Sequence, residues 1–193
     1  MADADDILRS FGMSGCLITD DLRQIEQQFG IELGHSGPVR RDASSYYPQF
    51  DQLIRKQAAE MAAYYELFYC LEQSIRELIT TSLFDKSGSN WWNITVPPKI
   101  VQDVTERILR EKDSGFSQRS EHEIDYTNFG ELSVIITSNW DVFGAIFSSK
   151  RAVERIMSSL NLLRGPIAHC SPLAADEVDR LMLTVKDWFR AMS

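Results

Sequence analysis

A long apolar seam between residues 54 and 79 constrains the fold of this chain more than any other feature. Its members are spaced alternately four and three residues apart, which is typical of one face of a long helix. They are Ile54, Ala58, Met61, Tyr65, Phe68, Glu72, Ile75 and Ile79. We predict one helix from about Pro48 to Leu83 at the centre of a helical bundle.

Glu72 is the one charged member of that seam, and a carboxylate on an apolar face needs a partner. Two cations are available: Arg76, one helical turn further on, and Arg164, near the C-terminus. Pairing with Arg76 would make Glu72 a structural residue, whereas pairing with Arg164 would make it the support of a functional site. The sequence leaves both pairings open.

A second apolar stripe at helical spacing predicts a helix from about Ser149 to Arg164. The stripe consists of Val153, Ile156, Met157, Leu160 and Leu163. Arg164 follows Leu160 by about one turn, so it projects from the buried side of this helix. A guanidinium in that position needs a partner or a crevice.

The residues that follow Arg164 predict a junction between two helices. Gly165 suits the position just past a helix end, and Pro166 opposes continuation of the helix. Ser171-Pro172 is typical of an N-cap and a first helical residue. His169 is therefore expected between two helices, close to the N-terminus of the second.

Arg164 and His169 carry the side chains that metal-free RNA cleavage requires. Arginine is always charged and holds a phosphate through two parallel donors, while histidine gives or takes a proton near neutral pH. The alternative is structural: Arg164 would bind carbonyls at its helix C-terminus, and His169 would cap the next helix.

The run from Leu160 to His169 resembles the Arg-x4-His signature of the HEPN superfamily. The chain is also similar to the HEPN branch found at the C-terminus of a nuclear RNA-surveillance endoribonuclease. The similarity to this branch lies in Asn139-Trp140-Asp141-Val142-Phe143, while the Ser171-Pro172 step and the final Trp188-Phe189 strengthen the Arg-x4-His signature. Together the resemblance spans about Tyr64 to Phe189.

This resemblance implies an all-α bundle that forms a homodimer, with two Arg-x4-His motifs facing each other across a cleft. Arg164 would hold the scissile phosphate of an RNA substrate, and His169 would assist attack by the 2′-hydroxyl, which leaves a cyclic phosphate. Glu72 and Asn161 are candidates for supporting roles. One position departs from the family: members commonly have Asn, Asp or His after the arginine, whereas Gly165 offers no side-chain donor or acceptor.

Two functions from different classes follow. The first is a metal-independent endoribonuclease, in RNA processing, stress response or antiviral defence. The second is a catalytically weak or inactive HEPN dimerisation module that regulates a partner protein. The intact motif favours the first function, and Gly165 with the net charge of -8 favours the second.

Lys150, Arg151 and Arg155 form a local basic strip near the motif and are our candidates for RNA binding. A protein that tracks phosphates over a broad surface is normally basic, so the acidic net charge argues against non-specific binding. The strip could also be an ordinary solvated helix face.

No metal or other cofactor is expected. Cys16, Cys70 and Cys170 are widely separated and form no CxxC pair, so they suggest neither a disulfide framework nor a zinc site. No apolar run approaches about 18 residues, and the start lacks a signal-peptide pattern. We expect no membrane segment, and a location in the cytoplasm, or in the nucleus of a eukaryotic cell.

Residues 1–44 are predicted to be an accessory N-terminal arm with its linker, and residues 45–193 the helical domain. The arm contains candidate helices over Ala4 to Phe11 and Thr19 to Phe29. Gly30 to Pro48 is rich in Gly and Ser and is the strongest linker signal of the chain.

The middle of the chain is expected to continue the helical pattern. Trp91 and Trp92 read as a bulky loop, whose rings could either stack on RNA bases or pack into the core. A helix to about Lys112, an exposed connection over Asp113 to Tyr126, and a helix over Thr127 to Phe147 with a break near Ser138-Asn139 should follow. The β-branched run Ser133 to Thr137 could pass for a strand, but it has no partner strand, so the predicted fold class is all-α.

Overall fold

The computed structural model describes residues 18, 19, 21, 22, 24–26, 28, 29 and 49–192. The chain divides into two units, Met1–Phe50 and Asp51–Ser193. In the first unit, the described residues between 18 and 29 are helical, as predicted for this segment. The helix predicted over Ala4 to Phe11 and the linker over Gly30 to Pro48 lie outside the described residues, so the boundary after residue 44 stays a prediction.

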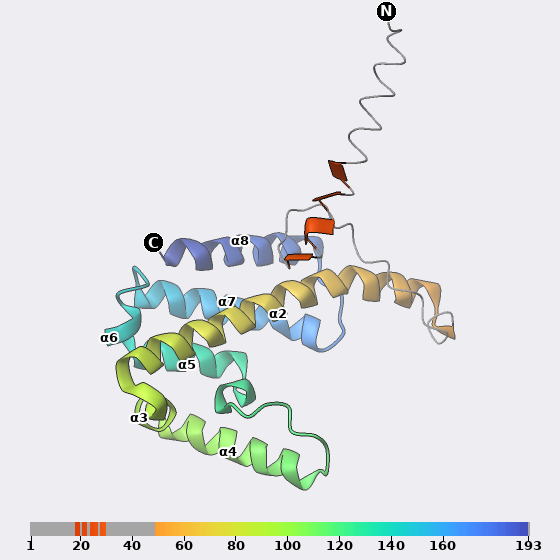
Figure 1. Ribbon diagram of the computed structural model, residues 1–193. Helices are drawn as coiled ribbons and strands as arrows, with labels where there is room; N and C mark the ends of the chain where they lie inside the picture. Colours follow the sequence, from red (N-terminus) through yellow and green to blue (C-terminus); the bar gives the residue numbers. More distant parts are fainter. Residues whose placement is uncertain (1–17, 20, 23, 27, 30–48, 193) are drawn as a thin grey trace, which may run out of the picture. The chain divides into compact units, whose positions relative to one another are not determined.

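The second unit is an all-α bundle, which confirms the predicted fold class, and none of its described residues forms a strand (Figure 1). Its helices are α2 (Gln52–Ser87), α3 (Trp91–Thr95), α4 (Pro98–Asp113), α5 (Phe129–Ser138), α6 (Trp140–Phe143), α7 (Lys150–Ala168) and α8 (Ala175–Ala191). Two short 3-10 turns, η2 (Gly88–Asn90) and η3 (Glu123–Tyr126), complete it.

Helix α7 lies between α8 and α5, and the C-terminal part of α2 packs against α5 and α7 (Figure 1). Helix α4 lies at the edge of the unit and contacts it through α3 and η3. The side chains that fill the centre come from four helices, because each buries one apolar stripe. They include Ile75, Ile79 and Leu83 of α2, Leu132 and Ile135 of α5, Met157 and Leu160 of α7, and Leu181 and Trp188 of α8.

The apolar seam of α2 is buried along only half of its length. Phe68 and Ile75 are 4% and 0% exposed, whereas Ile54 and Tyr65 are 57% and 63% exposed. The helix begins after Asp51, whose carboxylate accepts the N–H of Leu53 at 2.8 Å. Helix α2 is therefore central to the bundle from Phe68 onward, and residues 52–67, which we call the N-terminal half of α2, carry large apolar side chains on the surface.

Helix α7 continues through Gly165 and Pro166 to Ala168, so the predicted helix end at Arg164 is wrong. The proline lacks one N–H and its ring crowds the preceding turn, which costs most in a helix interior and less in a last turn. The next residue, Ile167, is only 9% exposed, and its burial against the core holds that turn in helical form. Tertiary packing thus overrides the local stop signal.

The predicted start of the last helix at Ser171-Pro172 is also wrong, because α8 begins at Ala175. The N–H of Ser171 donates to the carbonyl of Pro166 at 2.8 Å, which completes the end of α7 instead. The carboxylate of Glu177 accepts the N–H of Ala174 at 3.3 Å and marks the true start of α8. His169 is therefore the C-cap of α7 and does not lie at the N-terminus of α8.

The middle of the chain is more ordered than the sequence predicted. Trp91 and Trp92 lie in α3, are 8% and 6% exposed, and belong to the core, so the loop prediction is wrong. The connection predicted to be exposed contains η3, in which Tyr126 is 2% exposed. The helix ending near Lys112 and the break at Asn139 are confirmed, and the Ser133 to Thr137 run lies within α5.

Candidate functional site

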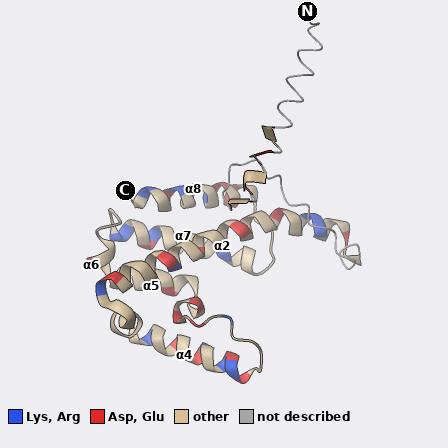
Figure 2. Cartoon of the chain, viewed as in Figure 1, with Lys and Arg blue, Asp and Glu red and all other residues tan. Residues whose placement is uncertain are grey.

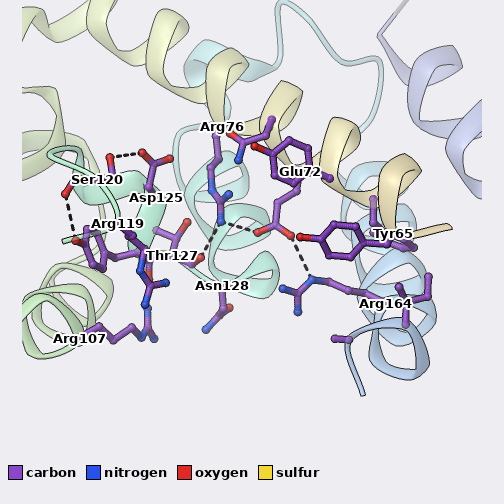
Figure 3. Close-up of a pocket in the computed structure, with 16 residues that line it drawn as sticks. Tyr65, Glu72, Arg76, Arg107, Arg119, Ser120, Asp125, Thr127, Asn128 and Arg164 are labelled. Carbon is purple, nitrogen blue, oxygen red and sulfur yellow. Dashed lines mark hydrogen bonds and ion pairs between the residues drawn. The ribbon is translucent and has the colours of Figure 1, made fainter. Parts of the chain in front are cut away.

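An open cleft of about 740 Å³ lies in the second unit between α2, the connection from α4 to α5, and the C-terminal end of α7 (Figure 3). Four arginines line it: Arg76, Arg107, Arg119 and Arg164. The other lining residues are Tyr65, Phe68, Tyr69, Glu72, Gln73, Ser120, Asp125, Tyr126, Thr127, Asn128, Ile167 and Ala168. A cleft with this many guanidiniums suits an anionic ligand.

Glu72 lies at the centre of the cleft and makes both of the pairings that the sequence left open. Its Oε1 accepts Nη2 of Arg76 at 2.5 Å, and its Oε2 accepts Nε of Arg164 at 3.2 Å. The side chains of Glu72 and Arg76 are 12% and 13% exposed, so this contact is screened little by water. One carboxylate therefore joins α2 to the C-terminal end of α7.

Arg164 is held by one nitrogen and leaves the other two available. Its Nε is the nitrogen bonded to Glu72, and within the part of the chain that the structure describes Nη1 and Nη2 have no hydrogen bond. The side chain is 37% exposed and reaches the cleft from α7 (Figure 3). A guanidinium fixed through Nε presents its terminal pair as a fork, the geometry that suits phosphate.

Arg76 forms part of the inner wall of the cleft. Besides Glu72, its Nη2 donates to the carbonyl of Thr127 at 3.1 Å, which ties α2 to the segment that precedes α5. Its Nε is buried without a hydrogen-bond partner. With its side chain 13% exposed, Arg76 acts on the protein and offers little to a ligand.

Arg107 is likewise committed to the protein. It makes a two-point pair with the carboxylate of Glu131 at 2.8 and 2.6 Å, and it donates to the carbonyl of Tyr126 at 2.8 Å. The hydrogen bond with Glu131 raises the pKa of Arg107 above its ordinary value. Because Glu131 also accepts the N–H of Asn128 at 2.7 Å in the capping box of α5, this pair anchors α4 to the start of α5.

Arg119 is clasped by Glu111 on the far side of the cleft. Its N–H and its Nε donate to the two oxygens of that carboxylate at 2.6 and 2.7 Å, and its guanidinium lies 4.9 Å from the centre of the Tyr126 ring. The bond from the Arg119 N–H is the main cause that lowers the pKa of Glu111. Arg119 could not be identified from the sequence, since only the fold brings the connection back over α4.

His169 does not line the cleft that contains Arg164. It is exposed at the end of α7, and its side chain has no hydrogen bond to any residue that the structure describes. The structural alternative is not observed either, since His169 does not cap α8 and Arg164 pairs with Glu72. Within one chain, Arg164 and Ala168 line the cleft and His169 does not.

The remaining candidate residues lie outside the cleft. Asn161 is exposed one turn before Arg164, with its amide nitrogen 4.0 Å from where a Cβ on Gly130 would lie. The basic strip is exposed at the N-terminal end of α7 (Figure 2). By the helical rise it lies about 14 to 21 Å from Arg164 along the axis. The strip consists of Lys150, Arg151 and Arg155.

No group of three or more His, Cys, Asp or Glu among the described residues is arranged to hold a metal ion. Cys70 and Cys170 are free and exposed, and Cys16 lies outside the described residues. None of the helices in the described ranges combines the length and the apolar character needed to cross a membrane.

Comparison with known proteins supports the family suggested by the motif. A family model described as Swt1-like HEPN matches residues 66–193, which contain Glu72, the four cleft arginines and His169. Searches among curated proteins and among solved structures found no match. The match covers most of the chain and nearly all of the second unit, and the chain therefore belongs to the Swt1-like HEPN family.

Proposed function

We propose that this chain is a metal-independent endoribonuclease that cleaves RNA at a composite Arg/His site in a homodimer. The observation that carries the proposal is the fixed guanidinium of Arg164, whose Nε is bonded to Glu72 while Nη1 and Nη2 face an open cleft. Membership of the HEPN family supports an RNA-related role of nuclease type. RNA processing, stress response or defence, in the cytoplasm or nucleus, are the proposed settings.

In the proposed reaction Arg164 binds the non-bridging oxygens of the scissile phosphate and stabilises the charge that grows on them. The 2′-hydroxyl of the preceding ribose attacks phosphorus, and the bond from phosphorus to the 5′-oxygen breaks. His169 takes the proton from the 2′-hydroxyl while water supplies one to the leaving 5′-oxygen, or it supplies that proton while water takes the first. The products are a 2′,3′-cyclic phosphate and a 5′-hydroxyl.

The second protomer enters the proposal because His169 lies outside the cleft of its own chain. An exposed imidazole at the end of α7 is free to serve the cleft of another copy. In a two-fold dimer the same pair of contacts occurs twice, so each Arg164 would receive the partner subunit's His169. This arrangement agrees with the facing motifs that the family resemblance implies.

Subunit complementation tests the composite site. Arg164→Ala and His169→Ala proteins should each fail to cleave RNA in EDTA, and after subunit exchange their mixture should recover about one quarter of wild-type activity. The quarter arises because half of the dimers are mixed and each mixed dimer has one complete site. Lys186→Ala, which removes an exposed charge from α8 outside the cleft, is the control that should keep most activity.

The outcomes separate the parts of the proposal. A mixture that stays inactive beside an active wild type would place both residues in one protomer's site. Absence of cleavage by the wild type, with the protein folded and dimeric, would overturn the nuclease itself.

Two further roles are proposed for residues outside the cleft. Lys150, Arg151 and Arg155 would contact RNA that extends beyond the cleft, because exposed charges about 14 to 21 Å away can reach only a longer strand. Asn161 would support Arg164 from the preceding turn of α7. Truncating the RNA to two nucleotides should abolish the effect of the basic strip and leave that of Arg164.

A HEPN dimerisation module that regulates a partner protein is the second candidate function. Gly165 favours it, since the position after Arg164 has open space around it and carries no polar group. The exposed apolar side chains on the N-terminal half of α2 favour a protein contact in either case. A folded wild type that binds a protein partner and leaves RNA intact would establish this alternative.

A further inference from the structure

Arg119 repeats, on the opposite side of the cleft, the arrangement that fixes Arg164 (Figure 3). Each guanidinium is bonded to a carboxylate through Nε, Arg164 to Glu72 and Arg119 to Glu111. In neither case do Nη1 and Nη2 hydrogen-bond to a described residue. Both side chains are accessible, 37% exposed for Arg164 and 59% for Arg119.

The four arginines of the cleft therefore fall into two pairs. Arg107 donates both terminal nitrogens to a carboxylate and a carbonyl of the protein, and Arg76, only 13% exposed, donates Nη2 to Glu72 and to the carbonyl of Thr127. Nη1 and Nη2 of Arg119 and of Arg164 remain available to a ligand. Two preorganised forks facing one cleft suit a ligand that carries two separate anionic groups.

Arg119 is also held more firmly than an ordinary surface arginine. Its backbone N–H and its Nε grip the same carboxylate, and the nearly buried ring of Tyr126 lies beneath the guanidinium. The Tyr126 hydroxyl donates in turn to Glu111 at 3.2 Å. A side chain held by a carboxylate and by a ring loses less conformational freedom when it binds an anion than a free surface arginine does.

We propose that Arg119 binds a backbone phosphate next to the one held by Arg164, so that the cleft takes a short stretch of single-stranded RNA across two phosphates. This inference rests on the proposed function. The volume of about 740 Å³ is in the range of sites for small ligands, which suits a few nucleotides of one strand and not a duplex. Tyr65 and Tyr69, exposed on the same cleft, offer ring faces to unpaired bases.

Asp125 is the cleft carboxylate that has no basic partner among the described residues. It accepts the hydroxyl of Ser120 at 2.5 Å, and its charge opposes an anion in the same space. The expected contribution of Arg119 is therefore moderate, about tenfold in affinity, as for one charge-assisted hydrogen-bonded contact.

Binding of two trinucleotides measures the second contact directly. Both are 2′-O-methylated, which prevents cleavage, and one has a single phosphate replaced by a neutral methylphosphonate. The wild type should bind the doubly charged ligand about tenfold more tightly, whereas Arg119→Ala should bind both ligands equally. With longer single strands, the same substitution should reduce the slope of log affinity against log salt by about 0.7.

Two other variants keep this test clear. Arg110→Ala removes the same charge from an exposed position of α4 outside the cleft, and it should retain the tenfold difference. Arg119→Gln can still donate to Glu111, so it tests the same point if Arg119→Ala disturbs the connection. Thermal unfolding of each variant reports whether the fold is intact.

Trinucleotide binding tests the second phosphate contact, and cleavage of unmodified RNA tests the nuclease. If both Arg119 variants keep the tenfold difference, the second phosphate contact is wrong, whatever the wild type does to cleavable RNA. Loss of the difference with no cleavage of unmodified RNA supports the contact and removes the nuclease. A wild type that binds neither trinucleotide overturns the second phosphate contact, and cleavage of unmodified RNA then decides the nuclease.

Discussion

Glu72 determines how two arginines can act, because its single carboxylate bonds to Arg76 and to Arg164. Its position in an apolar seam made it stand out in the sequence, and both candidate partners were identified there. Periodicity could not choose between them, since the choice depends on how closely α7 approaches α2. In the fold both pairings occur, because Arg76 and Arg164 bond to different oxygens of the Glu72 carboxylate.

Glu72→Gln should impair both cleavage and stability. The amide has one acceptor oxygen and no charge, so two cations near the core would lose their shared anion. We expect the free energy of unfolding in urea to fall by about 1–3 kcal/mol, and RNA cleavage to fall at temperatures where the variant remains folded. Glu66→Gln, an exposed position of the same helix, should change neither quantity. Full cleavage by Glu72→Gln would remove this residue from the site.

Gly165→Ala should leave stability nearly unchanged. Gly165 lies within α7, and a Cβ there would meet nothing within 4 Å outside its chain neighbours, so the substitution reduces the entropy of the unfolded chain. Pro166 opposes this gain, because its ring disfavours the helical conformation of a preceding residue that carries a Cβ. Gly144→Ala should lower the free energy of unfolding, because its Cβ would lie 2.7 Å from the carbonyl of Trp140. A loss for Gly165→Ala as large as that for Gly144→Ala would contradict this account.

Gly165→Asn addresses catalysis at the same position. The open space around Gly165 can accept a larger side chain, and the amide would supply a polar group beside Arg164. If the wild type is a weak nuclease, cleavage by this variant should increase severalfold and should remain dependent on Arg164. A decrease would indicate that the cleft needs the position empty.

At the scale of the elements, apolar periodicity predicted α2 and α7 because each buries one stripe over several turns. The predicted C-terminus of α7 and N-terminus of α8 were wrong, although Pro166 and Ser171-Pro172 are clear local signals for a helix end and a helix start. Burial of Ile167 outweighed the first signal, and no local pattern records that burial. The loop predicted at Trp91 and Trp92 was wrong because a five-residue helix is too short to show an apolar period.

The connection between α4 and α5 should loosen in acid because Glu111 clasps Arg119. The Arg119 N–H lowers the pKa of Glu111 below 4.5, its ordinary value. A carboxyl whose pKa is lower in the folded state stabilises that state above the ordinary pKa, and the contribution disappears as pH falls through the lowered value. Stability therefore declines with acidification in the range below about pH 5.

Urea unfolding of the wild type and of Glu111→Gln from pH 7 to pH 3 measures this contribution. The two proteins should differ at pH 7, and the difference should shrink toward acid, because the wild-type carboxyl takes up its proton as pH falls through its lowered pKa. Glu121→Gln, an exposed residue of the same connection, serves as the control. A difference that stays constant over the whole range would mean that the Glu111 charge is irrelevant.

At the scale of the whole molecule, the proposed homodimer requires the cleft of one protomer to face the partner. Leu53 and Ile54 are exposed on α2, N-terminal to the cleft residues Tyr65 and Tyr69, which stay open to the ligand. Burial of such side chains is the usual source of dimer stability. The motif in the sequence predicted the dimer only through family resemblance, whereas the exposed face is a feature of the fold.

Ile54→Asp should weaken the dimer. A carboxylate in place of a 57% exposed apolar side chain would have to be dehydrated at the interface. Sedimentation velocity across micromolar concentrations should shift toward the monomer, with the fold retained. Gln102→Asp introduces the same charge on exposed α4 and should leave the dimer unchanged. An unaffected dimer would place the interface elsewhere.

Helix α2 is packed along only its C-terminal half, so the order of its exposed N-terminal half affects the position of Glu72 in the cleft. With few packing contacts, the backbone of residues 52–67 should open locally at low free energy and exchange its amide hydrogens rapidly in a lone protomer. Glu72 lies little more than one turn beyond this segment, on the same continuous helix. Dimerisation would then reduce local opening of the helix as far as Glu72, which positions Arg164. The rate of RNA cleavage per protomer would therefore rise with protein concentration.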